Sequence, residues 1–180
     1  MRIISPLDNK DYKKADNEVM VFLGGSCDDK KDWRKNVIDF LESIEKEKFI
    51  KLDNLVIVNP FIKKWNPNEE ELKAEIEWES SMIDQSDIYS CYLYKGSDTP
   101  ITMFELGKSM YLYKSKYANS KMNHRIIVTA HPDYEKIDDL KFELAASTKN
   151  WKCDPVALTV EKNVAAHASK ILEAYLKFSK

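Results

Sequence analysis

Cysteine and histidine are both scarce in this sequence, and neither follows a metal-binding pattern. The three cysteines are an odd number with no CxxC pair, so neither a disulfide framework nor a structural zinc site is expected. The three histidines show no HxxxH or HExxH spacing, which argues against a catalytic metal. We therefore predict chemistry that needs no metal and no cofactor. The six residues are Cys27, Cys91, Cys153, His124, His131 and His167.

The sequence also lacks a charge excess and a long hydrophobic run. Its 28 Lys and Arg residues against 30 Asp and Glu residues give a net charge of −2. Binders of duplex nucleic acid usually carry a clear basic excess, so duplex nucleic acid is not an expected partner. No apolar run reaches the roughly 18–20 residues that span a bilayer, and the N-terminus has no signal-peptide pattern. We expect a cytoplasmic protein that does not bind membranes.

The length of 180 residues predicts one domain, since most domains have about 100–200 residues. Hydrophobic residues make up 43% of the chain and charged residues 32%, which excludes a disordered polyampholyte. Residues 1–17 are polar with one proline, and we interpret them as an arm or a short edge element. Residues 18–180 are expected to form the domain itself.

Short continuous apolar runs alternate with segments of helical periodicity. Such runs are typical of strands that are buried on both faces in a parallel sheet. Strands are predicted at 18–23, 55–58, 88–94 and 125–129, with a further strand at 140–146 and a short run at 156–160. Helices are predicted from residue 28 onward, at 69–84, from Thr99 onward and at about 162–178. The alternation predicts a three-layer α/β domain with a parallel sheet of about five strands.

Ligands bind to such domains at the carboxyl ends of the strands, and the residues there are the first candidates for a site. Gly24, Gly25 and Ser26 follow the first strand, and they could cradle an anion or a sugar or simply form a tight turn. Asn59 and Trp65 follow the second strand, and they could line a base or sugar pocket or simply cover the core. These residue types alone leave both pairs of alternatives open.

Glu79 occupies an unusual position in the helix predicted at 69–84. Leu72, Ile76 and Ile83 form an apolar stripe with one missing member, and Glu79 fills that slot. A carboxyl group on the edge of an apolar stripe must be solvated, paired or functional. We interpret Glu79 as functional.

Glu105 lies in the second turn of the helix that follows the third strand. Thr99 suits the N-cap and Pro100 the first helical position, so this helix begins at the ligand edge. Gly107 inside it costs about 1 kcal/mol relative to alanine, which indicates a close approach to something. Without a metal pattern or a Ser-His or Cys-His pair, carboxylate chemistry such as glycosyl transfer is favoured. The ordinary alternative is a solvated helix acid.

Several motifs, in this order and spacing, resemble the nucleoside 2-deoxyribosyltransferase superfamily, and more narrowly its short nucleoside 2-deoxyribosyltransferase-like branch. The resemblance covers about residues 18–146. The motifs are Val21-Phe-Leu-Gly-Gly-Ser26 with Trp33, Asn59-Pro60, Ile76-Glu-Trp-Glu79, Ser86-Asp87, Pro100-Ile-Thr-Met-Phe-Glu-Leu-Gly107, Arg125-Ile-Ile-Val and His131-Pro-Asp-Tyr134.

The resemblance implies a flavodoxin-like (Rossmann-type) fold that cleaves N-glycosidic bonds of deoxynucleosides or deoxynucleotides. It implies that Glu105 is the nucleophile and that Glu79, where the family commonly has Asp, is the supporting acid. The position that contacts the nucleobase in the family is Thr99 here, with Asp98 beside it. A homo-oligomer that shares its active site between subunits is also implied.

The working hypothesis is a metal-independent glycosyl transfer in which Glu105 attacks C1′ of a 2′-deoxyribonucleoside or its monophosphate, with Asp98 or Glu79 as the acid. The expected substrate-binding residues are Gly24, Gly25, Ser26, Asn59, Trp65, Thr99 and Thr102. Transfer to a second base and transfer to water both remain open. The alternatives are a nucleotide N-glycosidase of the same superfamily and a non-catalytic nucleotide-binding module.

Overall fold

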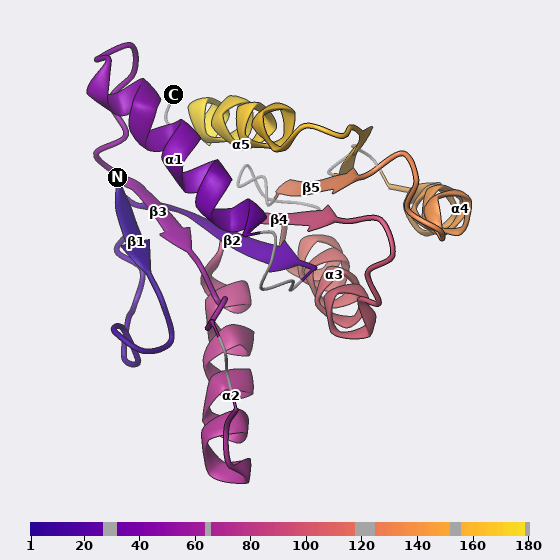
Figure 1. Ribbon diagram of the computed structural model, residues 1–180, viewed down its shortest axis with the longest axis horizontal. Coiled ribbons are helices and arrows are strands. Elements are labelled where there is room, and N and C mark those ends of the chain that lie inside the picture. Colours follow the sequence, from indigo (N-terminus) through magenta and orange to yellow (C-terminus); the bar gives the residue numbers. More distant parts are fainter. Residues whose placement is uncertain (27–31, 64–65, 118–124, 152–155, 179–180) are drawn as a thin grey trace.

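A parallel sheet forms the centre of the molecule (Figure 1). The computed structural model describes residues 1–26, 32–63, 66–117, 125–151 and 156–178. Within these residues the sheet has six strands, where about five were predicted. The strands are β1 (Arg2–Ile4), β2 (Val19–Gly25), β3 (Leu55–Val58), β4 (Ile88–Leu93), β5 (Arg125–Ala130) and β6 (Val156–Val160).

The strand order gives the fold its class. The order is β1-β3-β2-β4-β5-β6, and every neighbouring pair is parallel. Counted from β2, the last five strands have the order 2-1-3-4-5 of flavodoxin-like folds. The chain moves outward from β2 in one direction to β3 and in the other direction to β4, so the switch in strand order lies between β2 and β4.

Helices cover both faces of the sheet, as the apolar strands require. Helices α1 (Trp33–Lys46) and α5 (Val164–Phe178) lie over one face. Helices α2 (Glu69–Gln85), α3 (Pro100–Leu112) and α4 (Ile137–Thr148) lie over the other (Figure 1). A π-helical turn, η1 (Tyr113–Tyr117), extends α3. The result is the predicted three-layer α/β domain.

The strand predicted at 140–146 is wrong, because these residues belong to helix α4. Leu140 and Leu144 are the buried residues of this helix, and they are four positions apart, which is helical spacing. Phe142, which a strand would have placed on the same face as both leucines, is exposed. The apolar residues of this segment follow the helical period and not the period of two that a strand requires.

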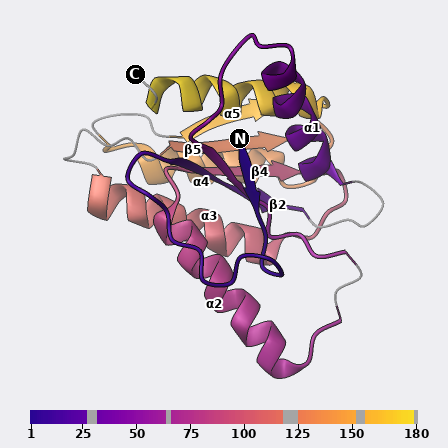
Figure 2. The same ribbon diagram turned by 90° about the vertical axis from the view of Figure 1, so that its left-hand side faces the viewer.

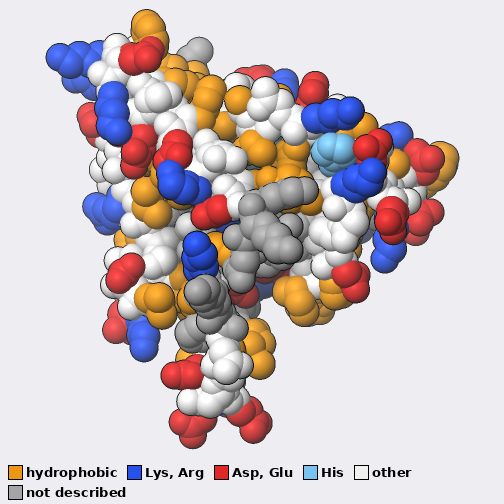
Figure 3. Space-filling model, viewed as in Figure 1, with side chains coloured by type: hydrophobic (Ala, Val, Ile, Leu, Met, Phe, Trp, Pro, Cys, Tyr) orange, Lys and Arg blue, Asp and Glu red, His pale blue; other side chains and the backbone are white. Residues whose placement is uncertain are grey.

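The apolar stripe predicted on α2 is wrong for two of its three members. Ile83 is buried, but Leu72 and Ile76 are 44% and 55% exposed, and the other buried residues of the helix are Trp78 and Met82. The beginning of α2 extends well past the sheet (Figure 2). Acidic side chains gather at this protruding end (Figure 3), where Glu69, Glu70 and Glu71 form the first turn. The stripe has no sheet beneath it there.

His167 of α5 lies at the centre of the layer between α5 and the sheet. Its side chain is fully buried, with Nε2 2.8 Å from Ser90 Oγ and Nδ1 2.8 Å from Thr129 Oγ1. Its ring also packs edge-on against Trp33 and Tyr92. Burial lowers the pKa of His167 to about 3, because a charged imidazole would lose its hydration.

This buried imidazole predicts a loss of stability in acid. The unfolded chain protonates His167 below about pH 6.5, whereas the folded chain excludes that proton down to about pH 3. The free energy of unfolding should therefore fall by about 1.4 kcal/mol per pH unit within this window. Denaturant melts of His167→Gln should show a shallower acid slope by about one proton, with His131→Gln as the control for losing an imidazole elsewhere. Identical slopes for His167→Gln and the wild type would contradict this.

Candidate functional site

The candidate site lies at the carboxyl ends of β2 and β4, at the switch in strand order. In the register of these two strands, Gly24 is opposite Cys91 and Gly25 is opposite Tyr92. Helix α2 precedes β4 in the chain and α3 follows it, and both helices pack against the same face of the sheet. The topology thereby brings β2, β4, α2 and α3 to the crevice where ligands bind in this type of sheet.

Both glycines at the end of β2 are required by packing within the protein. A Cβ on Gly24 would lie 2.4 Å from the hydroxyl oxygen of Tyr89, and a Cβ on Gly25 would lie 2.6 Å from the carbonyl oxygen of Tyr92. Gly25 also has a φ of +123°, which residues with a side chain rarely adopt. The glycines therefore give room to β4, and Gly24 in particular gives room to Tyr89.

Ser26 joins the turn after β2 to the turn after β4. Its backbone N–H donates to Tyr92 O at 3.1 Å, and its hydroxyl donates to Ser97 Oγ at 2.8 Å. The same hydroxyl oxygen accepts from the backbone N–H of Tyr94 at 3.1 Å. Ser26 therefore uses both of its donors inside the protein, and its substrate-binding role stays a prediction.

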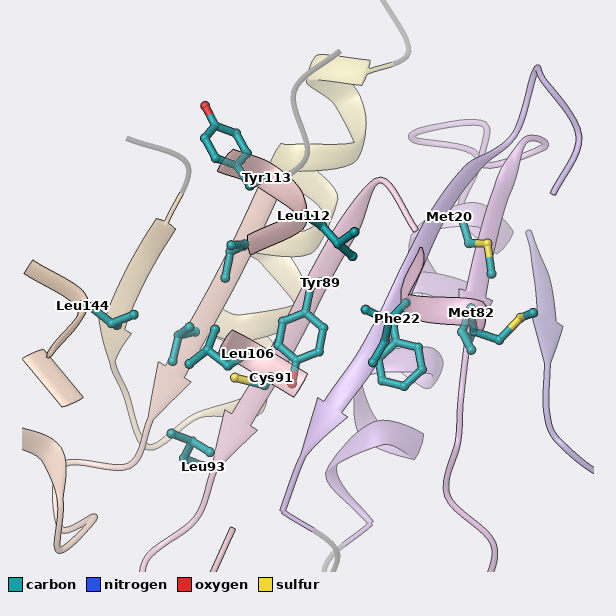
Figure 4. Close-up of a cluster of buried hydrophobic side chains, with 14 of the residues drawn as sticks. Met20, Phe22, Met82, Tyr89, Cys91, Leu93, Leu106, Leu112, Tyr113 and Leu144 are labelled. Atoms are coloured by element: carbon teal, nitrogen blue, oxygen red, sulfur yellow. The ribbon is translucent and has the colours of Figure 1, made fainter. Parts of the chain in front are cut away.

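Glu105 lies in the second turn of α3, half-buried beside β4. The hydroxyl of Tyr89 donates to Glu105 Oε2 at 3.1 Å and is also 3.4 Å from Thr102 O. Tyr89 is fully buried, and its ring stacks on Phe22 of β2 with centroids 5.9 Å apart (Figure 4). A rigid, buried phenol thus fixes one oxygen of the Glu105 carboxyl group.

Glu79 lies on α2, the helix next to α3, and it is also half-buried. Lys108 holds the two helices together: its ammonium group donates to Ser80 O at 2.8 Å and forms a 3.1 Å ion pair with Asp84. Because Ser80 adjoins Glu79 and Lys108 is one turn beyond Glu105, this contact joins the helix segments that carry the two carboxyl groups.

The two carboxyl groups differ in their electrostatic surroundings. Burial, together with repulsion from Glu105 and Glu75, raises the pKa of Glu79 to about 8. Burial also raises the pKa of Glu105, but the hydrogen bond from Tyr89 and the charges of Arg34 and Lys108 oppose that rise. These surroundings favour a proton on Glu79 and ionisation of Glu105. Unequal carboxyl groups of this kind can act as a proton donor and a nucleophile.

Arg34 is the buried cation of this region. It is 3% exposed, and it is the only Lys, Arg, Asp or Glu that is buried among the residues that the structure describes. Its guanidinium group lies over the ring of Trp33 and 5.8 Å from the ring centre of Phe61, in the segment after β3. Its positive charge lowers the pKa of both Glu79 and Glu105.

Comparison with known families identifies the family of this chain. A family model described as "Nucleoside 2-deoxyribosyltransferase like" matches residues 18–118, which is more than half of the chain. This chain is a member of the nucleoside 2-deoxyribosyltransferase-like family. The matched segment runs from just before β2 to beyond the end of α3, so it contains both candidate carboxyl groups of this family member.

Beyond the family match, the similarities are distant. No curated protein matches this sequence. Among solved structures, the chain is similar to an FMN-dependent NADH-azoreductase from Bacillus anthracis in complex with FMN, at 12% identity and a TM-score of 0.39. The similarity covers 91% of this chain and 100% of that one. At this level, nothing about flavin or nicotinamide carries over to the family member described here.

The remaining site residues predicted for this family member differ from one another in burial and in their contacts. Asp98 is exposed in the turn before α3. Thr99 is the N-cap of α3, as predicted, but its hydroxyl lies 3.2 Å from Tyr134 Oη and makes no cap hydrogen bond. Thr102 is buried, and the Asn59 side chain accepts from the backbone N–H of Phe61. Trp65 is outside the described residues, as are Cys27, Cys153 and His124.

Gly107 has no close neighbour within the described part of the chain. It is exposed, and a Cβ there would have nothing within 4 Å. The close approach that the sequence indicated is therefore not made to any described residue of this protein. Among those residues there is also no group of three His, Cys, Asp or Glu side chains suited to a metal, and no helix long and apolar enough to cross a membrane.

Sequence reasoning missed Tyr89 and Arg34, although each had a signal. Tyr89 is a hydroxyl-bearing residue within the first half of β4, a strand predicted to be buried on both faces. Arg34 is three residues before Val37 and four before Ile38, which places it on the buried face of α1. Arg34 is a charged residue in a helix with many charged residues, so its place on the buried face is not evident from residue type alone.

Proposed function

We propose that this protein catalyses N-glycosyl transfer or hydrolysis on 2′-deoxyribonucleosides or their monophosphates through a covalent deoxyribosyl intermediate on Glu105. The observation that carries the proposal is the pair of unequal carboxyl groups, Glu79 and Glu105, at the carboxyl edge of the sheet. Membership of the nucleoside 2-deoxyribosyltransferase-like family supports glycosyl transfer as the reaction class.

In the first step, the ionised carboxylate of Glu105 attacks C1′ of the deoxyribose. The C1′–N bond breaks, and its electron pair leaves with the nucleobase. Glu79, which is protonated at neutral pH, donates its proton to the departing base. The products of this step are a neutral free base, a Glu105 deoxyribosyl ester and an ionised Glu79.

In the second step, a nitrogen of another base, or a water oxygen, attacks C1′ from the face that the first base left. Ionised Glu79 accepts the proton of this nucleophile. The bond from C1′ to the Glu105 oxygen breaks and returns its electron pair to the carboxylate. Two displacements retain the configuration at C1′, and both carboxyl groups regain their starting protonation.

Tyr89 supports the assignment of Glu105 as nucleophile. Burial, with the nearby Cys91 and Glu105, raises the pKa of Tyr89 well above its ordinary value, so its hydroxyl stays a donor. Its hydrogen bond to Oε2 orients the carboxylate and leaves Oε1 as the oxygen to attack. Asp98, the other acid considered, is exposed, whereas Glu79 has the burial that keeps a proton on a carboxyl group.

The direct test is release of base. The purified protein is incubated with each 2′-deoxyribonucleoside and each 5′-monophosphate, with and without a second free base, and the mixtures are separated by chromatography. A new nucleoside indicates transfer, and free base with deoxyribose or its phosphate indicates hydrolysis. Calorimetric binding of a nucleoside or nucleotide without release of base from any substrate would instead favour the non-catalytic binding module.

We propose further that a second copy of the chain covers the outer face of α3. Ile101, Phe104 and Tyr111 recur there at helical spacing and are 68%, 77% and 69% exposed, and Gly107 lies between them with open space above it. Exposed apolar side chains grouped in this way mark an interaction surface. Since the same helix carries Glu105, a partner on this face would stand beside the site.

Light scattering after size-exclusion chromatography tests this assembly. The wild type is expected to be a dimer or larger, and Phe104→Asp should shift it to the monomer while reducing turnover. Phe49→Asp is the matched control, because Phe49 is 74% exposed in the turn after α1, on the other face of the sheet. A monomeric wild type, or an assembly that Phe104→Asp leaves intact, would contradict the proposal.

A further inference from the structure

A small cavity lies between α5 and the beginnings of β5 and β6, and its volume is about 220 Å³. Arg125 and Val156, the first residues of the two strands, line it from one side, and Lys170 and Lys177 of α5 line it from the other. Because all strands of the sheet are parallel, the amino ends of β5 and β6 lie at the edge opposite to that of Glu105. The cavity is therefore separate from the candidate site described above.

Arg125 brings an unsatisfied donor to this cavity. Arg125 and Ile127 are two positions apart in β5, so they face the same side of the sheet, on which Ile127 packs in the layer of α1 and α5. The Nε atom of Arg125 is buried, and no residue that the structure describes accepts a hydrogen bond from it. A buried donor of a charged group costs free energy when it has no acceptor. An acceptor from outside the chain would remove that cost.

The charges around the cavity favour an anion as this acceptor. Three cationic side chains line the cavity, against one carboxylate, that of Glu173. Both oxygens of this carboxylate already accept hydrogen bonds, Oε1 from Lys177 at 2.9 Å and Oε2 from Lys170 at 3.3 Å. Glu173 is thus committed to the two lysines, and the side chains that line the cavity keep a positive excess.

We propose that this cavity binds a phosphate group, either as inorganic phosphate or as the monoester of a small alcohol. An arginine guanidinium group matches the oxygens of phosphate with parallel donors, and lysine ammonium groups add further positive charge. The apolar side chains of Ile127, Val156 and Ala174 line the rest of the cavity, where the short carbon chain of a monoester fits. The proposal is independent of the reaction proposed at Glu105.

NMR of the arginine side chains tests this site directly, because the chain has three arginines, Arg2, Arg34 and Arg125. Protein labelled with ¹⁵N at arginine Nε is titrated with sodium phosphate and, separately, with glycerol 3-phosphate, while sodium chloride keeps the ionic strength constant. The Nε–H signal of Arg125, assigned by its loss in Arg125→Gln, is expected to shift and to saturate. Arg2, which is exposed on β1, is the internal control and should keep its signal.

Calorimetry on variants gives a second measurement. Arg125→Gln should weaken the binding of inorganic phosphate by about tenfold or more, which corresponds to the loss of one charge-assisted hydrogen bond. Lys141→Gln is the matched control for the loss of a positive charge, since Lys141 pairs with Asp138 on α4. Its affinity for phosphate should equal that of the wild type.

The absence of a saturable Arg125 shift with both ligands would overturn the proposal, as would an unchanged phosphate affinity in folded Arg125→Gln. A shift confined to Arg34 would place the phosphate at the candidate site instead, and it would also overturn the proposal. If Arg125→Gln does not fold, Arg125→Lys supplies the assignment and the wild-type titration decides. Within a confirmed site, tighter binding of glycerol 3-phosphate would identify a monoester as the ligand, and tighter binding of inorganic phosphate would identify the free ion.

Discussion

Replacement of Glu105 by glutamine is expected to abolish release of base from every substrate that the wild type cleaves. An amide cannot form the deoxyribosyl ester, and removal of a covalent nucleophile usually lowers the rate by several orders of magnitude. The folded protein should tolerate the change. Because burial raises the pKa of Glu105, its ionised form opposes folding at neutral pH, and the neutral amide should leave the melting temperature unchanged or higher.

Base release, melting temperature and mass spectrometry, measured on one preparation of each protein, test this prediction for Glu105→Gln. Glu143→Gln, on the exposed face of α4, is the matched control and should keep full activity. Mass spectrometry of wild-type protein quenched during turnover should show a chain heavier by one deoxyribosyl group, and Glu105→Gln should lack this species. Base release by a well-folded Glu105→Gln at the wild-type rate would remove Glu105 from the mechanism.

Replacement of Glu79 by glutamine is expected to lower the rate by about 10²-fold or more, as typical for loss of a positioned acid–base group. Burial raises the pKa of Glu79 to about 8, so the wild-type rate should fall as the pH rises through 8 and the proton is lost. Glu79→Gln should have no such alkaline limb, because glutamine does not titrate. Rate profiles from pH 6 to 10 measure both effects.

A substrate whose leaving group needs no proton separates this role from simple misfolding. A nitrophenyl deoxyriboside releases nitrophenolate, which leaves without a proton. With this substrate, Glu79→Gln should form the Glu105 ester at a rate close to that of the wild type. Glu77→Gln is the matched control, since Glu77 lies on the same helix, is 69% exposed and pairs only loosely with Lys73. Equal losses on both kinds of substrate would show that Glu79 is not the proton donor.

The sheet could be predicted from the sequence because its strands are apolar on both faces. The runs at 18–23, 55–58, 88–94 and 125–129 coincide with β2 to β5 within one or two residues. The failures lie where one face meets solvent. Residues 140–146 were assigned to a strand instead of α4, and the stripe at Leu72 and Ile76 was expected to be buried, because short apolar patterns do not reveal what lies beneath them.

The candidate carboxyl groups could be predicted in part, for a different reason. Glu105 follows from its place in a helix that begins at the carboxyl edge of a parallel sheet, and the structure places it there. Glu79 was singled out by a stripe of which only Ile83 is buried in the folded chain, and the structure places Glu79 on α2, the helix next to the one that carries Glu105. The spacing that the family resemblance implied also selected Glu79, and its role in the site stays a prediction.

The sequence by itself determined the layer architecture and the segment of α3 that carries Glu105, because periodicity and helix-start signals are local properties of the chain. Only the tertiary structure decided which groups surround that carboxylate. Tyr89 donates to it from β4, the charge of Arg34 on α1 lowers its pKa, and Gly24 is small because Tyr89 needs its space. Burial and charge are set by neighbours brought together from separate elements, so the raised pKa of Glu79 and the opposing influences on the pKa of Glu105 arise only once the chain has folded.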